Sequence, residues 1–398
     1  MYCWANKSLS IRTSLAVNHL DERSLVRILH WAFPFHPGRG GQSIWIERMV
    51  RAYAHTQHGV ALIVDASVDL RELKKLFCEK VTIIQTSIVS IPKSKSNVAH
   101  IKEITLEIDK FRPDIIHVHN LESQALVYLR FFQLMKNRSI PLICTLHDLT
   151  SVKRLQSLHS LSPNLPSFSA VVSPSKFIDS QVNHLTIGQG TQFRVINHGV
   201  PSTDERRTNG SHFPTLLFAS DLHNHKGGVI LMSAWKSICK NFPDVVLNIA
   251  GDGHSRKFLE DYAFLSGLSG QVRFLDWLGQ EQLGEILKAD CILIVPSLLG
   301  EAFGLIAAEA AMAGAAIIVS RIGALPEIIE NEVSGLVVTP GDSFALADAI
   351  QRLLADAKLR LSLGKAAKTR AENLFSFDKS VSAYDLLYKE CTSQIDVR

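Results

Sequence analysis

Short apolar runs alternate with amphipathic stretches along most of the chain. Each run is apolar on both faces, as in parallel strands that helices cover on both sides. In the first half these runs are Val26–Phe33, Val60–Val64, Val81–Ile84, Ile115–Val118, Leu142–Leu146, Ala170–Val172 and Phe193–Ile196. Pro34 and a glycine loop separate the first run from a helical pattern over Ser43–Gln57, which leads into the second run. The chain therefore opens with a βαβ unit.

The alternation stops over residues 201–213, which are polar and predict a linker, and then it restarts. Strands are expected at Thr215–Ala219, Val246–Ala250, Val272–Leu275, Cys291–Val295, Ala316–Val319 and Gly335–Val338. Helices are expected near Val229–Lys240, Arg256–Ser266, Gln280–Lys288, Leu305–Ala313, Phe344–Ala355 and Asp378–Cys391. Two such α/β units in succession predict two Rossmann-like, doubly wound domains that face a central cleft.

The expected organisation has five parts. Residues 1–23 form an irregular N-terminal extension, residues 24–200 the first domain, residues 201–213 the linker, residues 214–374 the second domain and residues 375–398 a final helical segment. A length of 398 residues fits two domains of ordinary size. With 46% hydrophobic and 20% charged residues, the chain can build packed cores and is too weakly charged to be disordered.

Several classes of protein are excluded by what the chain lacks. No 18-residue stretch is apolar throughout, which excludes a membrane-spanning helix. Lys7, Arg12 and His19 interrupt any apolar segment of a secretory signal. The six cysteines (positions 3, 78, 144, 239, 291 and 391) form no CxxC pair, so we expect isolated and mostly buried thiols. These features predict a cytoplasmic protein without a disulfide framework or a zinc site.

Charge is distributed unevenly between the two halves. Residues 1–200 carry 23 Lys and Arg against 14 Asp and Glu, a net charge of +9, whereas residues 201–398 carry 19 against 24, a net charge of −5. A basic half fits peripheral contact with an anionic membrane, a phosphorylated acceptor or nucleic acid, and equally a plain solvated surface. No basic and aromatic stripe or known nucleic-acid motif accompanies it, so no nucleic-acid partner is expected.

Two glycine loops follow predicted strands. Arg39-Gly40-Gly41 precedes a helix, where free amides and the helix dipole favour an anion. Gly251-Asp252-Gly253 follows the predicted strand Val246–Ala250. Neither loop has the GxGxxG spacing, so neither supports a dinucleotide site. Each loop fits a phosphate site or simply a tight turn.

Several charged residues stand where open α/β sheets bind ligands, at the carboxyl ends of strands. Glu301 follows Cys291–Val295, and Glu309 lies eight residues later on nearly the same face of the next helix. Their carboxylates are suited to bind sugar hydroxyls, although Glu309 also fits a solvent-facing helix position. Lys226 is placed to meet a phosphate, and His147 follows a strand of the first half, on the opposite wall of the cleft.

The stretch from Pro296 to Leu336 carries Pro-Ser-Leu-Leu-Gly-Glu-Ala-Phe-Gly-Leu, then Glu-Ala, Ala-Gly, Gly-Ala-Leu-Pro-Glu and Gly-Leu. It resembles retaining glycosyltransferases of family 4, whose hallmark is an E-x7-E motif on a GT-B fold. The resemblance extends over most of the chain, through Gly40-Gly41, residues 113–119, 145–148 and 172–175, Lys226-Gly227 and Gly251-Asp252-Gly253-His254. Residues 375–388 look like the family's final helix, which crosses back to the N-terminal domain.

The resemblance implies a role for each matching residue. The catalytic residues are His147, which lies over the reacting sugar, and Glu301, which contacts the donor sugar; Glu309 contacts the ribose hydroxyls. The donor-binding set is Lys226, Gly251, Gly253, Phe303, Gly304, Leu305 and Glu309, and the phosphate or acceptor loop is Arg39, Gly40 and Gly41. The implied activity is transfer from a nucleotide-sugar donor to a saccharide or lipid-linked acceptor, in cell-surface polysaccharide or glycolipid synthesis. No Asp-x-Asp pair occurs, so no metal and no other cofactor is expected.

One departure from the family concerns a cation. Relatives have Gly-Arg-Leu before Lys-Gly, whereas this chain has Ser220-Asp221-Leu222, so an acid replaces the second diphosphate cation. Either Asp221 turns away, or His223, His225 or Arg39 compensates for it, or the protein is a sugar-nucleotide-binding protein without catalysis. A nucleotide-sugar epimerase of the same fold is a third alternative. Smaller departures are His198, where asparagine is common, and Asp276, where glycine is common.

Overall fold

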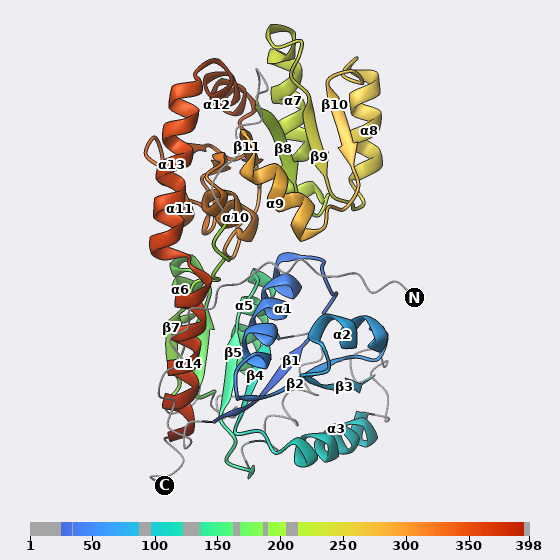
Figure 1. Cartoon of the computed structure of the whole chain (residues 1–398), viewed down its shortest axis with the longest axis vertical. Helices are drawn as coiled ribbons and strands as arrows, with labels where there is room; N and C mark the ends of the chain where they lie inside the picture. The colour runs from blue at the N-terminus through green and yellow to red at the C-terminus, as the bar shows by residue number, and fades with distance from the viewer. Residues whose placement is uncertain are drawn as a thin grey trace.

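The computed structural model describes residues 25–33, 35–86, 97–121, 135, 137–161, 168–185, 190–203 and 214–393. The extension predicted for residues 1–23 and residues 204–213 of the predicted linker lie outside them. The described residues form two α/β domains, one above the other (Figure 1). The prediction of two Rossmann-like domains is confirmed.

The N-terminal domain is built on a parallel sheet. Its seven described strands lie in the order β3-β2-β1-β4-β5-β6-β7. They are β1 (Arg27–Ala32), β2 (Gly59–Asp65), β3 (Thr82–Thr86), β4 (Ile115–His119), β5 (Leu142–Thr145), β6 (Ala170–Ser173) and β7 (Gln192–Val195). The helices of this part are α1 (Gly41–Ala54), α2 (Leu70–Phe77), α3 (Asn97–Phe111), α5 (Leu149–Leu161) and α6 (Lys176–Val182). The strand order reverses between β1 and β4, where such sheets bind ligands.

The C-terminal domain repeats this plan. Its six described strands are also parallel, in the order β10-β9-β8-β11-β12-β13. They are β8 (Thr215–Ala219), β9 (Leu247–Ala250), β10 (Val272–Leu275), β11 (Cys291–Val295), β12 (Ala316–Ser320) and β13 (Leu336–Val338). The helices are α7 (Gly228–Ile238), α8 (Arg256–Leu265), α9 (Gln280–Lys288), α10 (Leu305–Ala313), α11 (Leu325–Ile328), α12 (Ser343–Ala355) and α13 (Ala357–Leu374), with 3-10 turns at Asn224–Lys226 and Cys239–Asn241. The sheet reverses its order between β8 and β11.

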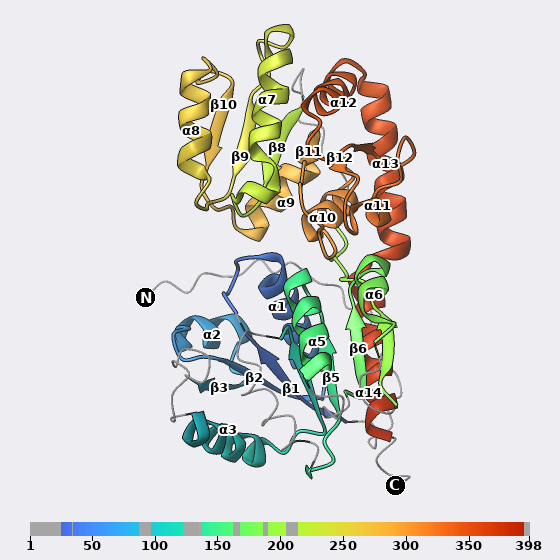
Figure 2. The ribbon, with the colours of Figure 1, turned by 180° about the vertical axis from the view of Figure 1, so that it is seen from behind.

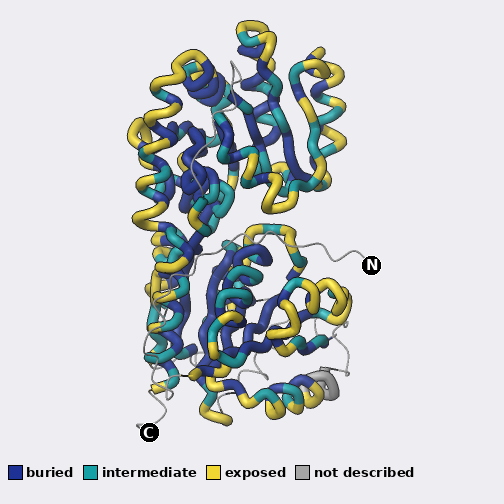
Figure 3. Tube along the Cα trace, in the orientation of Figure 1, coloured by how far each residue is buried: buried dark blue, intermediate teal, exposed yellow. Residues whose placement is uncertain are grey.

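Each sheet has a hydrophobic core on both of its faces. In β1, Leu29 and Trp31 pack against α3, α5 and α6, whereas Ile28 and Ala32 pack against α1 and α2. The sheets and the inward faces of the helices are the buried part of both domains (Figure 3). Burial on both faces explains why the strands read as continuous apolar runs rather than as alternating ones.

The chain crosses between the domains twice, and the two crossings pair with each other. The amide of Val200 donates to Phe375 O (2.8 Å), and the amide of Phe377 donates to Val200 O (3.0 Å). Gly199 is required here, since a Cβ at this position would lie 2.5 Å from the Cα of Phe377. After the second crossing, α14 (Phe377–Ser393) packs along the N-terminal domain, as the view from behind shows (Figure 2).

The helices of the structure differ from the sequence pattern in their bounds and in number. The first helix begins at Gly41 and ends at Ala54, two to three residues before the predicted Ser43–Gln57 at each end. Helix α13 has no counterpart among the predicted elements, because its Lys- and Arg-rich sequence shows weak apolar periodicity. Its buried Arg360 pairs with Asp290 through Nε (3.1 Å) and Nη2 (2.8 Å), so a charged residue occupies a core position.

Candidate functional site

The N-terminus of α10 carries free backbone amides at the carboxyl edge of the C-terminal sheet. Among the described residues, the amides of Phe303, Gly304 and Leu305 have no hydrogen-bond acceptor. Gly304 is the N-cap residue, with φ of 96°, and a Cβ there would lie 2.6 Å from a methyl carbon of Leu325. Free amides together with the helix dipole make this helix end suited to bind an anion such as a phosphate.

An ion pair lies beside these amides. Lys226 Nζ donates to Glu301 Oε1 (2.7 Å), and Ser297 Oγ donates to the same oxygen (2.7 Å). Burial by itself raises the pKa of Glu301, but Lys226 and Ser297 outweigh that effect and hold the pKa below its usual value. Glu301 is therefore ionised at neutral pH, and the pair brings no net charge to the site.

Gly227 allows Lys226 to reach this position. Its φ is 78°, and a Cβ there would lie 1.9 Å from the carbonyl oxygen of Pro296, just after β11. The short turn before α7 can approach the end of β11 this closely only with glycine. The amide of Leu298 then donates to His225 O (2.7 Å), which ties the two loops together.

Glu309 lies one turn into α10 and is bound from the other domain. Its Oε1 accepts a hydrogen bond from Arg48 Nη2 (2.6 Å), and the same nitrogen also donates to Gln280 Oε1. The Glu309 side chain is only 13% exposed. The alternative that Glu309 is a solvent-facing helix residue is therefore wrong.

The glycine loop of the N-terminal domain faces the same helix end. A Cβ at Gly41 would lie 3.7 Å from Leu305, and Trp277 Nε1 donates to Gly38 O (3.2 Å). Gly40 is the N-cap residue of α1 with φ of 73°, and Arg39 beside it is exposed. The structure thus places Gly41 against Leu305 of the donor-binding set.

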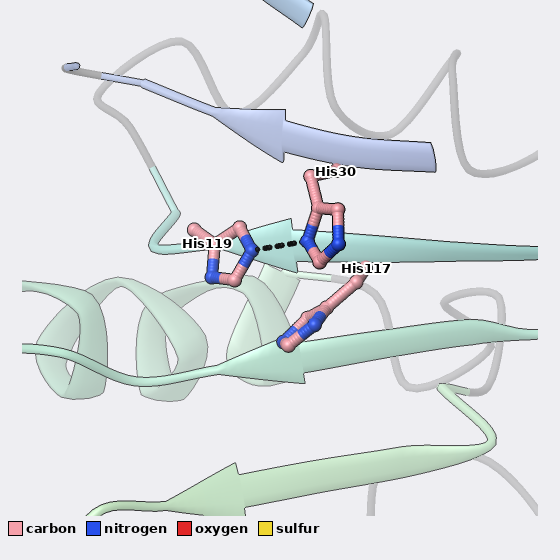
Figure 4. Close-up of side chains that lie close together, drawn as sticks. All are labelled: His30, His117 and His119. Carbon is pink, nitrogen blue, oxygen red and sulfur yellow. Dashed lines mark hydrogen bonds between the residues drawn. The ribbon is translucent and has the colours of Figure 1, made fainter. Parts of the chain in front are cut away.

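His147 belongs to a chain of four hydrogen-bonded histidines. His30 Nδ1 and His119 Nε2 are 2.9 Å apart, His119 Nδ1 and His147 Nε2 are 3.0 Å apart, and His147 Nδ1 and His198 Nε2 are 3.0 Å apart. Figure 4 shows the first of these bonds, with His117 next to it. His198 ends the chain at the domain interface, where its ring lies 5.5 Å from that of Phe303.

Burial makes these histidines neutral. It lowers the pKa of His30 and of His147 to about 3, and the pKa values of His117, His119 and His198 fall well below the usual range for the same reason. A neutral imidazole donates through one nitrogen and accepts through the other, so the tautomers all run in one direction along the chain. Both ring nitrogens of His147 are already occupied.

Gly251 and Gly253 have a packing role in this structure. A Cβ at Gly251 would lie 2.0 Å from Ser220 O, and one at Gly253 would lie 2.7 Å from Leu222 O. The Gly251 amide donates to Asp276 O and the Gly253 amide to the Asp252 carboxylate, so both donors are engaged. Their close approach fixes the loop that carries Asp221.

Asp221 and His225 interact, but the pKa of His225 is lowered on balance. Burial and then Lys226 lower that pKa more than Glu301 and Asp221 raise it, so a charged His225 is not favoured beside Asp221. His223 instead bonds His254 (Nδ1 to Nδ1, 2.8 Å). No described side chain donates a hydrogen bond to the Asp221 carboxylate, which is half-buried.

Two family models divide the chain between them. The model described as Glycosyltransferase Family 4 matches residues 39–204, and the model described as Glycosyl transferases group 1 matches residues 202–370. The chain belongs to glycosyltransferase family 4.

Individual relatives agree with this assignment. The D-inositol 3-phosphate glycosyltransferase of Corynebacterium diphtheriae is 27% identical over 318 residues, 72% of each chain. An uncharacterised glycosyltransferase of Methanocaldococcus jannaschii is 32% identical over 174 residues, so the chain spans less than half of that relative (44%). The structure of HepE from Anabaena in complex with UDP and glucose has a TM-score of 0.73 at 18% identity, over 92% of this chain and all of that one. The expected GT-B fold is confirmed.

One group of residues in this glycosyltransferase has a geometry suited to a metal ion. His30, His117 and His119 each offer a nitrogen, all within 4.8 Å of one another (Figure 4). However, both ring nitrogens of His117 are engaged, by Tyr388 OH and Thr145 Oγ1 (2.7 Å each), and both ring nitrogens of His119 are engaged, by His30 and His147. These residues do not fit a resident metal.

Sequence reasoning missed three participants in the site of this glycosyltransferase. Arg48 and Trp277 reach across from their own domains, and no local pattern indicates a contact 239 or 261 residues away. His198 was visible as a departure from the family, but its partnership with His147 depends on how β5 and the loop after β7 lie in the sheet. Both ends of the histidine chain have a free nitrogen among the described residues, His30 Nε2 and His198 Nδ1.

Proposed function

We propose that this protein transfers a sugar, with retention of anomeric configuration, from a nucleotide-sugar donor to a saccharide or lipid-linked acceptor. The observation that carries the proposal is the row of free amides at Phe303, Gly304 and Leu305 beside the Lys226–Glu301 pair. Those amides and Lys226 would bind the diphosphate and stabilise its charge as the bond to the sugar breaks. Glu309, one turn further along α10, would bind the ribose hydroxyls.

The remaining residues would position the sugar. Glu301 has a second oxygen, Oε2, without a partner among the described residues, and this oxygen can accept a sugar hydroxyl. His147 is neutral and bonded at both nitrogens, so it is unsuited to act as a general base. The acceptor proton would therefore pass to the departing phosphate oxygen, on the face where the new bond to the sugar forms.

We propose that the reaction needs no metal ion, because Lys226 and the amides at the N-terminus of α10 would meet the charge of the diphosphate. We also propose that the basic N-terminal half holds the acceptor at an anionic membrane surface and that the protein works on the cytoplasmic side, in polysaccharide or glycolipid synthesis. No helix among the described residues combines the length and hydropathy needed to cross a bilayer.

A donor screen tests the proposal. UDP-, GDP- and ADP-sugars are compared for the rise in melting temperature, since a ligand that binds only the native state raises it. The best donor is then incubated with and without acceptors, and with EDTA. Slow release of nucleoside diphosphate without acceptor, unaffected by EDTA, supports the transferase. Binding without turnover on any acceptor indicates a nucleotide-binding protein without catalysis, and interconverted sugar still attached to nucleotide indicates an epimerase.

A further inference from the structure

The side chain of Arg48 belongs to the N-terminal domain but makes its hydrogen bonds to the C-terminal domain. Its Nη2 donates to Glu309 on α10 and to Gln280 on α9. The side chain is 18% exposed, so it is mostly withdrawn from solvent between the two domains. One nitrogen of Arg48 thus bonds two residues of the C-terminal domain, Gln280 after β10 and Glu309 after β11.

The other terminal nitrogen of Arg48 is unused. Nη1 is buried and has no hydrogen-bond partner among the described residues. A buried donor without an acceptor is costly, the more so when the group is charged. A guanidinium keeps its charge in proteins and has five N–H donors in a fixed plane, so Nη1 cannot turn away independently of Nη2.

The position of Arg48 is at the nucleoside end of the proposed donor site. The diphosphate would lie at the α10 amides near Leu305, and the ribose at Glu309, one turn further from that helix end. Arg48 contacts both Glu309 and Gln280. If a nucleoside binds at Glu309, the side of the nucleoside that faces away from the diphosphate would therefore lie next to Arg48. A carboxylate has room for both the guanidinium and ribose hydroxyls, since its two oxygens accept about four hydrogen bonds.

We infer that Arg48 is a nucleoside-binding residue that the N-terminal domain contributes to the donor site, with Nη1 donating to an oxygen of the nucleoside. This rests on the proposed function. Because Arg48 and Glu309 lie on opposite domains, the nucleoside subsite is complete only when the domains are together.

Two substitutions and a matched control test the role of Arg48. Arg48→Met keeps the aliphatic stem and removes all donors, whereas Arg48→Lys keeps the charge but replaces the planar fork of five donors by the three donors of one ammonium nitrogen. Arg51→Met is the control: Arg51 lies one turn later on α1, pairs with Glu47 of the same helix (3.2 Å) and is 43% exposed. The dissociation constants of UDP and of inorganic pyrophosphate are measured by calorimetry, with GDP and ADP in parallel.

The inference predicts a loss confined to ligands with a nucleoside. Arg48→Met should weaken UDP binding about tenfold or more, as expected for a lost hydrogen bond from a charged group, and leave pyrophosphate binding unchanged. Arg48→Lys should also weaken UDP binding, and Arg51→Met should change neither ligand.

Other results would overturn the inference. If Arg48→Met binds UDP within twofold of the original protein, Arg48 does not contact the nucleoside. If Arg48→Met binds UDP more tightly, Arg48 competes with the nucleoside for Glu309. Equal losses for UDP and pyrophosphate would place the effect at the phosphates or in domain closure. If the unsubstituted protein, with its normal melting temperature, binds none of the three nucleotides, the proposed function fails and the inference fails with it; nucleotide binding that ignores Arg48 leaves the proposed function standing.

Discussion

Mild acid should unfold the N-terminal domain before the C-terminal domain. Five histidines of the N-terminal domain (His30, His117, His119, His147 and His198) are buried with pKa values far below 6.5, the first and fourth at about 3. In the unfolded chain each titrates near 6.5. Below that pH the unfolded state therefore binds more protons than the folded state, and stability falls as the pH falls.

The size of this loss of stability follows from the difference in histidine pKa between the unfolded and the folded state. At pH 5 each histidine costs about 2 kcal/mol of stability, since 1.5 pH units below the unfolded pKa correspond to 1.5 times 1.36 kcal/mol. Five such groups amount to about 10 kcal/mol, and even half of this sum is comparable with the whole stability of a domain, about 5–15 kcal/mol. Stability is fully present above about pH 7 and is lost progressively below pH 6.5.

Differential scanning calorimetry at pH 7.5 and pH 5 checks this expectation. At pH 5 the transition of the N-terminal domain should separate from that of the C-terminal domain and move to lower temperature, and Trp45, stacked on His198 (4.4 Å), should report it by fluorescence. His198→Asn should lower the number of protons taken up on unfolding by about one, and the pH dependence of the melting temperature should weaken accordingly. The control His184→Gln, at an exposed position, should leave that dependence unchanged. A single transition at pH 5 with an unchanged midpoint would refute the assignment of these histidines as neutral and buried.

Four further outcomes are expected. Lys226→Ala should weaken UDP binding about 10- to 150-fold in calorimetry, because a charged hydrogen bond is lost and Glu301 is left facing the diphosphate; affinity equal to that of the original protein would contradict this. Glu309→Ala should weaken donor binding by about 1–3 kcal/mol through lost ribose contacts, and unchanged affinity would rule those contacts out. Asp290→Ala should destabilise the C-terminal domain by about 3–5 kcal/mol, because it leaves the buried Arg360 unpaired, and an unchanged melting temperature would show that the pair is unimportant. The protein should sediment with anionic vesicles, less so at 1 M salt, where the screening length is about 3 Å, and equal recovery with neutral vesicles would remove the membrane proposal.

The sequence predicts the two sheets well because both faces of their central strands are covered. In such a fold a short apolar run bounded by turn residues is most readily a buried strand. The runs Ile115–Val118 and Cys291–Val295 accordingly correspond to β4 and β11. The helix α13 was not predicted, since its side chains are largely polar and its buried Arg360 breaks the apolar pattern. Local periodicity cannot indicate a charged residue that is buried because a distant carboxylate pairs with it.

The candidate site was predictable only where one segment supplies it. Glu301, Gly304 and Glu309 lie on one strand–helix connection, so their spacing indicates a shared site before any tertiary contact is known. Arg48 and His198 act through residues of distant segments, and their partners depend on how the domains and strands are arranged. The resemblance to family 4 located the donor side, whereas the cross-domain contacts required the structure.

The two paired crossings at Val200 and Ser376 impose an order on biosynthesis. The residues that complete the core of the first-made domain, among them Tyr384 and Tyr388, leave the ribosome after the entire second domain has been made. Until then the part of the sheet face that they cover is open, and His117 lacks its hydrogen bond to Tyr388 OH (2.7 Å). The domain at the start of the polypeptide therefore matures last, and a message truncated before residue 377 would yield one finished domain and one with an open core.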